Sequence, residues 1–253
     1  MLFDSHAHLD DHKFDADRDE IIAALKKSGI SYVVNIGADI ESSENSVNLA
    51  EKYDFIYAAV GVHPYDAEMV DDDLIDKLKE MAQNKKVVAI GESGLDYHYE
   101  EADREVQKNA FIKHINLANQ LDLPVIVHNR DAHKDMMDIL VENKPQNAII
   151  HCYSGSSEMA KELVKMGYYI SFSGTVTFKN AAKVQQAAQV VPLDRLLIET
   201  DCPYLCPEPE RGRRNDPTKI RFTAEKLAEI KGVTFEEMAK ITQENAKRIY
   251  KID

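Results

Sequence analysis

Apolar residues along the chain gather in eight short runs of strand length, and a stretch with helical spacing follows each run. Most runs are continuously apolar rather than alternating, which is the pattern of parallel strands covered by helices. We therefore predict eight strand–helix units. The runs begin near Met1, Ile30, Phe55, Lys86, Leu123, Asn147, Tyr168 and Arg195.

The stretches between the runs carry helix boundary signals. Segment 17–29 has acidic residues at its start, lysines near its end and a glycine as C-terminal stop. Segment 156–167 repeats this plan, with a serine as N-cap and a glycine after the last turn. We expect a longer helix over 102–121 and a final amphipathic helix from about Thr234.

Eight strand–helix units predict a (β/α)8 barrel of the TIM type, whose functional site lies at the C-terminal ends of the strands. We expect a single domain spanning 1–253, because no Gly-, Ser- or Pro-rich linker divides the chain. One irregular stretch, 202–217, holds four prolines and a basic cluster. A doubly wound open sheet is the alternative, but no G-x-G-x-x-G loop follows the first run.

Composition and charge narrow the class of protein. The chain has 44% hydrophobic and 30% charged residues, as ordinary globular proteins do. A net charge of −13 argues against a protein that coats long nucleic acid, but not against an enzyme that captures one strand end. We see no signal peptide and no apolar run of membrane-spanning length. We expect a cytoplasmic protein with reduced thiols and no membrane partner.

Side chains that bind metals stand at the ends of these runs. Asp4, His6 and His8 share one strand face, because side chains alternate along a strand. In a barrel the carboxyl ends of all strands meet at one rim, so we expect these side chains to converge. The other candidates are His63, Glu92, His128, His151 and Asp201.

Four imidazoles and two carboxylates are too many ligands for one tetrahedral ion. They suit two divalent ions about 3.5–4 Å apart that share a bridging carboxylate and generate a nucleophile at neutral pH. Ligation by nitrogen and oxygen fits Zn, Mn, Co or Mg without choosing among them. We expect Cys152 to point to the strand face opposite His151, and Cys202 and Cys206 to pack within their loop.

Seven motifs together resemble the TatD family of metal-dependent deoxyribonucleases, a branch related to the amidohydrolase barrels. The resemblance covers essentially the whole chain and implies a (β/α)8 barrel that hydrolyses ester bonds of nucleic acids. Several members remove nucleotides from DNA 3′ ends. The motifs are DSHAHLD (4–10), GVHP (61–64), GESGLDY (91–97), PVIVHNR (124–130), HCYSG (151–155), ETDCPYL (199–205) and RGRRNDP (211–217).

The resemblance also implies a set of metal ligands. Glu92 would bridge the two ions, where many related amidohydrolases use a carboxylated lysine. Ser93 and Asn129 stand where the family commonly has Ile and Ser, but neither replaces a ligand. The implied ligands are His6, His8, Glu92, His128, His151 and Asp201.

Further roles follow from position. We expect Asp201 to be both ligand and base, since it closes the last run and could orient the attacking water. Asp4 and Glu199 share a strand face with a ligand and are candidate acceptors for imidazole N–H groups. His63 resembles the family histidine that contacts the substrate phosphate or the leaving group; a structural His-Pro turn is the alternative.

Arginines supply candidate phosphate contacts. Arg130 has the same parity as His128 and could hold a phosphate bidentately, or instead pair with Asp131. A basic cluster follows the eighth run near the rim where barrels commonly bind phosphate, although surface arginines are common. The cluster consists of Arg211, Arg213 and Arg214.

Three functions remain open at this point. The leading hypothesis is a two-metal phosphodiesterase that trims nucleic-acid ends, with single-stranded DNA as the expected substrate. The rival is an amidohydrolase that cleaves a small cyclic amide, lactone or phosphotriester on the same scaffold. The third is a metal-binding or scaffold protein with a decayed site, which the complete ligand set disfavours. The fold alone does not separate them.

Overall fold

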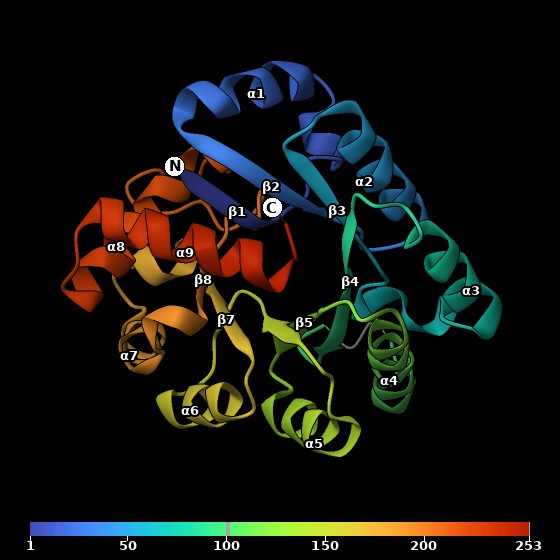
Figure 1. Cartoon of the computed structure of the whole chain (residues 1–253). Coiled ribbons are helices and arrows are strands. Elements are labelled where there is room, and N and C mark those ends of the chain that lie inside the picture. Colours follow the sequence, from blue (N-terminus) through green and yellow to red (C-terminus); the bar gives the residue numbers. More distant parts are fainter. Residues whose placement is uncertain (100–101, 253) are drawn as a thin grey trace. The chain divides into compact units, whose positions relative to one another are not determined.

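The computed structural model describes residues 1–99 and 102–252 and contains one eight-stranded sheet in the order β1 to β8 (Figure 1). The strands lie at the eight predicted runs. They are β1 (Leu2–Ala7), β2 (Ile30–Ile36), β3 (Ile56–Val60), β4 (Val87–Asp96), β5 (Val125–Arg130), β6 (Ala148–Ile150), β7 (Tyr169–Phe172) and β8 (Leu196–Ile198).

Helices alternate with the strands, which confirms the predicted (β/α)8 barrel class. They are α1 (Arg18–Leu25), α2 (Ile40–Lys52), α3 (Asp72–Met81), α4 (Arg104–Leu121), α5 (His133–Asn143), α6 (Ser157–Lys165), α7 (Ala182–Val190), α8 (Ile220–Lys231) and α9 (Phe235–Ile249). Within the described part of the chain, no helix combines the length and the apolar character that crossing a membrane requires.

The predicted helix ends are confirmed in their local chemistry. Gly29 follows the first helical segment with a φ of 82°, a left-handed conformation that costs glycine little. Ser156 and Thr234 accept hydrogen bonds from backbone N–H groups of the first turns of α6 and α9. Helix α4 starts slightly later than expected because Asp103 is its N-cap and accepts from two N–H groups.

The chain forms two compact units, each with its own core: unit 1 comprises 1–34 and 151–253, and unit 2 comprises 35–150. In unit 1 the consecutive helices α6 to α9 pack against one another, and α9 also covers β1 and β8 (Figure 1). The ring of Tyr250, just after α9, stacks on Phe3 at 6.0 Å between centroids. Its hydroxyl donates to the Ser5 carbonyl oxygen at 2.8 Å, which fixes β1 against the helix.

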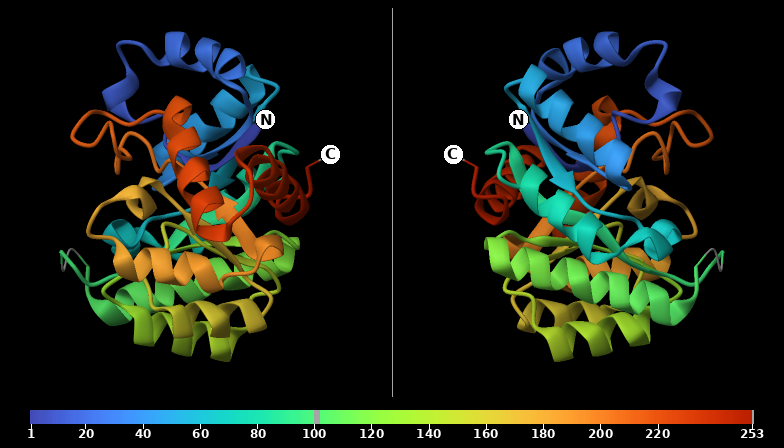
Figure 2. Two further views of the ribbon diagram at one scale, coloured as in Figure 1. Left: turned by 90° about the vertical axis from the view of Figure 1, so that its left-hand side faces the viewer. Right: turned by 90° about the vertical axis from the view of Figure 1, so that its right-hand side faces the viewer.

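In unit 2 the strands β3, β4, β5 and β6 pair in parallel, while α4 and α5 run side by side (Figure 2). Helix α4 packs on β4 and buries Phe111 and Ile115 completely. The register of β4 against β5 shifts between Ile90 and Ser93. A bulge of this kind re-aims side chains next to it, and here it contains Glu92.

A fully buried histidine of α4 supports the loop after β3. His114 Nε2 accepts a hydrogen bond from the Val62 N–H at 3.1 Å, and its Nδ1–H donates to the Ala110 carbonyl oxygen at 2.8 Å. Both ring nitrogens are therefore satisfied only in the neutral form. Burial lowers the pKa of His114 to about 4. The residue fixes the backbone next to His63.

Candidate metal centre

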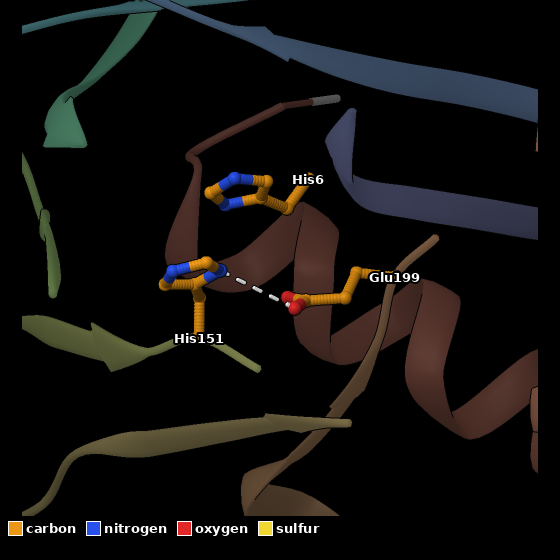
Figure 3. Close-up of side chains that lie close together, drawn as sticks. All are labelled: His6, His151 and Glu199. Carbon is orange, nitrogen blue, oxygen red and sulfur yellow. Dashed lines mark ion pairs between the residues drawn. The ribbon is translucent and has the colours of Figure 1, made fainter. Parts of the chain in front are cut away.

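Unit 1 gathers side chains from β1 and from the segments after β6 and β8. One potential ligand atom from each of His6, His151 and Glu199 lies within 4.8 Å of the others, and all three side chains are buried (Figure 3). The imidazoles of His6 and His151 face each other with centroids 4.0 Å apart and an interplanar angle of 8°. Glu199 Oε1 is 3.4 Å from His151 Nδ1 and accepts a hydrogen bond from the Cys152 N–H at 2.7 Å.

Two further predicted ligands join this unit 1 cluster. Asp201 Oδ1 is 3.6 Å from His6 Nε2 and 3.5 Å from His8 Nε2. The two Nε2 atoms are themselves 3.2 Å apart. Burial alone would raise the pKa of Asp201, but the hydrogen bond from His8 and the nearby charges of His6 and His151 hold it below its usual value. The carboxylate is therefore ionised at neutral pH.

The backbone at Asp201 is held in the left-handed region, with a φ of 55°. Its N–H donates to the His6 carbonyl oxygen at 2.9 Å, which ties the end of β8 to the end of β1. A left-handed conformation costs a non-glycine residue about 1–2 kcal/mol and persists where the surroundings impose it, often at functional sites. This turn brings the Asp201 carboxylate to the two imidazoles.

The donors in unit 1 fit a divalent cation. Within the described residues, the buried atom Glu199 Oε2 has no hydrogen-bond partner, which is costly unless a cation or water completes it. His6 Nε2 and His8 Nε2 are 3.2 Å apart, a distance at which either a proton or a cation must lie between the two nitrogens. Imidazole nitrogen with carboxylate oxygen is the donor set of Zn and similar ions.

Asp4 does not take the role predicted for it. Its carboxyl group accepts hydrogen bonds from the Thr200 N–H at 2.9 Å and the Thr200 hydroxyl at 2.6 Å, rather than from an imidazole N–H. Complete burial raises the pKa of Asp4 to about 8, against the opposing effect of the Thr200 hydrogen bonds. Asp4 thus fixes the backbone that leads into Asp201.

Unit 2 brings together Glu92 of β4, His128 of β5 and His63 of the loop after β3. One potential ligand atom from each lies within 4.8 Å of the others. Glu92 Oε1 is 2.8 Å from His128 Nδ1 and 3.8 Å from His63 Nε2. Glu92 is buried inside β4, which runs on to Asp96.

The backbone assigns the tautomer of His63. Its Nδ1 accepts a hydrogen bond from the Tyr65 N–H at 3.2 Å. A backbone N–H can only donate, so neutral His63 carries its proton on Nε2. The Nε2–H points towards the Glu92 side of the cluster, 3.8 Å from Oε1. His63 caps the turn after β3 and also presents a hydrogen-bond donor.

Asp96 is a residue of this cluster that the sequence did not single out. It is buried, and its Oδ2 is 3.0 Å from His128 Nε2 and accepts from the Tyr65 hydroxyl at 3.0 Å. Burial acts to raise the pKa of Asp96, but hydrogen bonds from His128 and from the His98 backbone lower it to about 2. Asp96 lies on the same strand face as Glu92, because side chains alternate along β4, and this shared parity could have identified it from the sequence.

The predicted phosphate-binding arginines have different surroundings. The Arg130 guanidinium lies over the exposed Tyr99 ring at 4.9 Å, while Asp131, its alternative partner, is 2.9 Å from His98. Tyr99 in turn contacts Tyr65, with ring centroids 6.0 Å apart. The predicted role of Arg130 stays a prediction.

The three arginines of the basic cluster, which lies in unit 1, have different partners. Arg213 pairs with Glu210 at 2.6 Å, and Arg214 pairs with Asp17 through both guanidinium NH groups at 2.9 and 2.5 Å. Arg211 stacks over the Phe178 ring at 4.1 Å. Ion pairing reduces the attraction that Arg213 and Arg214 offer to a phosphate. Arg211 keeps its charge available.

Thiols contribute no ligand to either cluster of described residues. Cys202 and Cys206 are buried, and Cys206 Sγ donates to the Glu210 carbonyl oxygen, as expected for loop packing. Cys152 Sγ lies 3.2 Å from Ser173 Oγ. The donor set is therefore imidazole and carboxylate.

Comparison with known proteins places these clusters in a family. The family model described as TatD related DNase matches residues 3–251. The chain belongs to the TatD family. Its relatives include the Bacillus subtilis protein YabD, described as an uncharacterized metal-dependent hydrolase, with 48% identity over 100% of both chains. A Cronobacter sakazakii relative described as the 3'-5' ssDNA/RNA exonuclease TatD is 33% identical, over 98% of this chain and 97% of that one.

A solved structure in the TatD family has the same fold. The Escherichia coli TatD homolog YJJV superposes with a TM-score of 0.93 at 28% identity, covering 100% of this chain and 98% of the other. Family membership makes the chain a metal-dependent hydrolase. The TatD resemblance seen in the motifs is thereby confirmed.

Proposed function

We propose that this protein removes nucleotides from the 3′ end of single-stranded DNA by hydrolysing phosphodiester bonds with two divalent metal ions. The observation that carries the proposal is the ionised Asp201 carboxylate, within 3.6 Å of two imidazole nitrogens that approach each other to 3.2 Å. The name of the Cronobacter sakazakii relative supports a nucleic-acid substrate. The proposed ligands are His6, His8, Glu92, His128, His151 and Asp201.

The proposed chemistry divides between the ions and the side chains. When bound, the ions would supply Lewis acidity, which lowers the pKa of a water and offsets charge on the attacked phosphate. Asp201, kept ionised by its histidine neighbours, accepts the proton of the attacking water. His63 presents its Nε2–H to a phosphate oxygen or to the leaving oxygen.

Cationic side chains would hold the substrate phosphate. Among the described residues, Arg130 makes no ion pair within 4.0 Å, although a hydrogen bond to Tyr99 and the more distant Asp96 carboxylate stabilise its charge. Arg213, in contrast, is paired with Glu210 at 2.6 Å. Two guanidinium N–H groups can bind a phosphate bidentately, and the Tyr99 ring under Arg130 keeps its plane in place. We propose Arg130 as the main phosphate contact, with Arg211 and Arg213 as weaker contacts.

The test is cleavage of a 5′-labelled single-stranded DNA oligonucleotide by the full chain. The protein is stripped with a chelator, then supplied with Mg²⁺ or Mn²⁺, next to Asp201→Asn and the exposed control Asp76→Asn of α3. We expect a ladder that shortens from the 3′ end with wild type and Asp76→Asn. We expect none without metal or with Asp201→Asn.

Other outcomes contradict the proposal in distinguishable ways. Cleavage of an RNA oligonucleotide but not of DNA would change the substrate and keep the chemistry. Absence of cleavage by wild-type protein that binds two ions per chain would exclude a nuclease acting on strand ends. Hydrolysis of a lactone or a phosphotriester by that protein would then favour the small-molecule hydrolase.

A further inference from the structure

We propose that Asp96 and Tyr65 are positioning residues that fix the tautomer of His128, with the proton on Nε2 and the lone pair of Nδ1 facing the cation. The inference rests on the proposed role of His128 as a metal ligand. It assigns a function to two residues that are not themselves in the ligand set. All the residues involved belong to unit 2.

The ring of His128 lies between two carboxylates. Its Nδ1 is 2.8 Å from Glu92 Oε1, and its Nε2 is 3.0 Å from Asp96 Oδ2. A ring nitrogen binds a cation only through its lone pair, so the other nitrogen carries the proton and needs an acceptor. Glu92 belongs to the cluster with His63 and His128 that could hold an ion. The cation side is therefore Nδ1, and Asp96 is the acceptor for Nε2–H.

Hydrogen bonds that do not involve His128 hold Asp96 in place. The Gln107 side chain of α4 pairs with the Asp96 backbone in both directions: Oε1 accepts from the Asp96 N–H at 2.8 Å, and Nε2 donates to its carbonyl oxygen at 3.0 Å. Asp96 Oδ1 accepts from the His98 N–H at 2.9 Å, which leaves Oδ2 directed at His128. Such prior fixation reduces the entropy lost when a ligand imidazole is ordered.

Tyr65 connects the two histidines of the cluster. Its hydroxyl donates to Asp96 Oδ2 at 3.0 Å, the oxygen that faces His128. Its backbone N–H donates to His63 Nδ1, so that ring also carries its proton on Nε2, but there Nε2 is the nitrogen that faces Glu92. The rings of His63 and His128 have centroids only 4.5 Å apart. One residue thus makes His128 a lone-pair ligand and His63 an N–H donor.

Unit 2 contains a matched pair for comparison. The Tyr97 hydroxyl donates to Asp135 Oδ2 at 2.8 Å, so it repeats the tyrosine–aspartate chemistry of Tyr65 and Asp96. The same Asp135 oxygen pairs with the Lys108 ammonium at 2.8 Å instead of a histidine. Substitutions in this pair change the same functional groups without touching a proposed ligand.

The experiment measures Zn²⁺ affinity of the chelator-stripped full chain by competition with a chromophoric chelator. We expect Asp96→Asn to weaken the binding that depends on His128 by about 10–100-fold, because its amide can reverse the tautomer. Tyr65→Phe removes one donor and should weaken binding severalfold. Tyr97→Phe and Asp135→Asn should match wild type.

A second readout reports the tautomer directly. In Zn²⁺-loaded protein with ¹⁵N-labelled histidine, we expect the His128 proton on Nε2 and the metal on Nδ1 in wild type. Metal on Nε2 would overturn the inference, as would unchanged affinity of both Asp96→Asn and Tyr65→Phe. If Asp96→Asn does not fold, Tyr65→Phe decides, since it deletes one hydroxyl. Wild-type protein that binds no divalent ion would instead refute the proposed metal function.

Discussion

Replacing His114 with glutamine should remove part of the acid sensitivity of the fold. In the native chain His114 is fully buried and neutral, with a pKa lowered by burial to about 4 from the ordinary value of 6.5. Between these pH values the unfolded chain binds more protons than the folded chain. The free energy of unfolding therefore increases with pH in this window and falls on acidification.

The magnitude follows from the two pKa values. The stabilisation is present above pH 6.5 and is lost as the pH falls towards 4. At about 1.4 kcal/mol per unit of pKa difference, the whole window corresponds to about 3 kcal/mol. Between pH 7 and pH 5 the contribution is about 2 kcal/mol. Glutamine can still accept from the Val62 N–H but does not titrate.

The assay is urea unfolding at pH 7 and pH 5, with the change in unfolding free energy compared between proteins. We expect His114→Gln to lose about 2 kcal/mol less than wild type on acidification. The control is His12→Gln, because the His12 side chain is 82% exposed and the variant makes the same histidine-to-glutamine change outside the core. Equal acid sensitivity of His114→Gln and wild type would refute the argument that burial keeps His114 neutral.

Three further predictions concern the two clusters. Gly94→Ala should lower the free energy of unfolding in urea by about 3 kcal/mol or more, because its Cβ would lie 2.0 Å from the His128 carbonyl oxygen. The control Gly29→Ala has no atom within 4 Å of its Cβ and should lower it by about 1 kcal/mol. Glu199→Gln should weaken Zn²⁺ binding about 10–100-fold in a chelator competition, since His151 loses its carboxylate partner. Chelation should lower the Tm by roughly 5–10 °C relative to protein with excess metal, and an equal Tm would contradict a structural contribution of the ions.

The elements of the fold were predictable because their signals are local. Apolar runs, N-caps and terminal glycines act within a few residues, and the predicted strands and helix ends agree with the structure. The exception is β4, whose path from Gly91 to Asp96 does not follow from local signals alone. A bulge between Ile90 and Ser93 interrupts the register of β4 against β5, and no local sequence pattern predicts this bulge.

The candidate site was predictable only in part, since partners come from distant segments. Strand alternation placed Glu199 beside an imidazole, 3.4 Å from His151 Nδ1, but the N–H whose hydrogen bond Glu199 Oε1 accepts is that of the Cys152 backbone. The same reasoning was wrong for Asp4, because its carboxyl group accepts from the Thr200 N–H and hydroxyl, 196 residues further along the chain, and from the His6 backbone N–H. Asp96 has the same parity as Glu92 and was still missed, since its importance depends on the direction of the His128 ring.

The discontinuity of unit 1 has a consequence for the order of events during synthesis. A chain emerging from the ribosome delivers His6 and His8 first, yet Asp201 and His151 follow only after all of unit 2 has been made. Unit 2 is contiguous, so its histidines and Glu92 can meet while translation continues. His6 and His8 therefore stay without the Asp201 carboxylate until the end of unit 1 has been synthesised. A nascent chain stalled before residue 151 would therefore offer the incomplete half of the donor set to any cation or chaperone nearby.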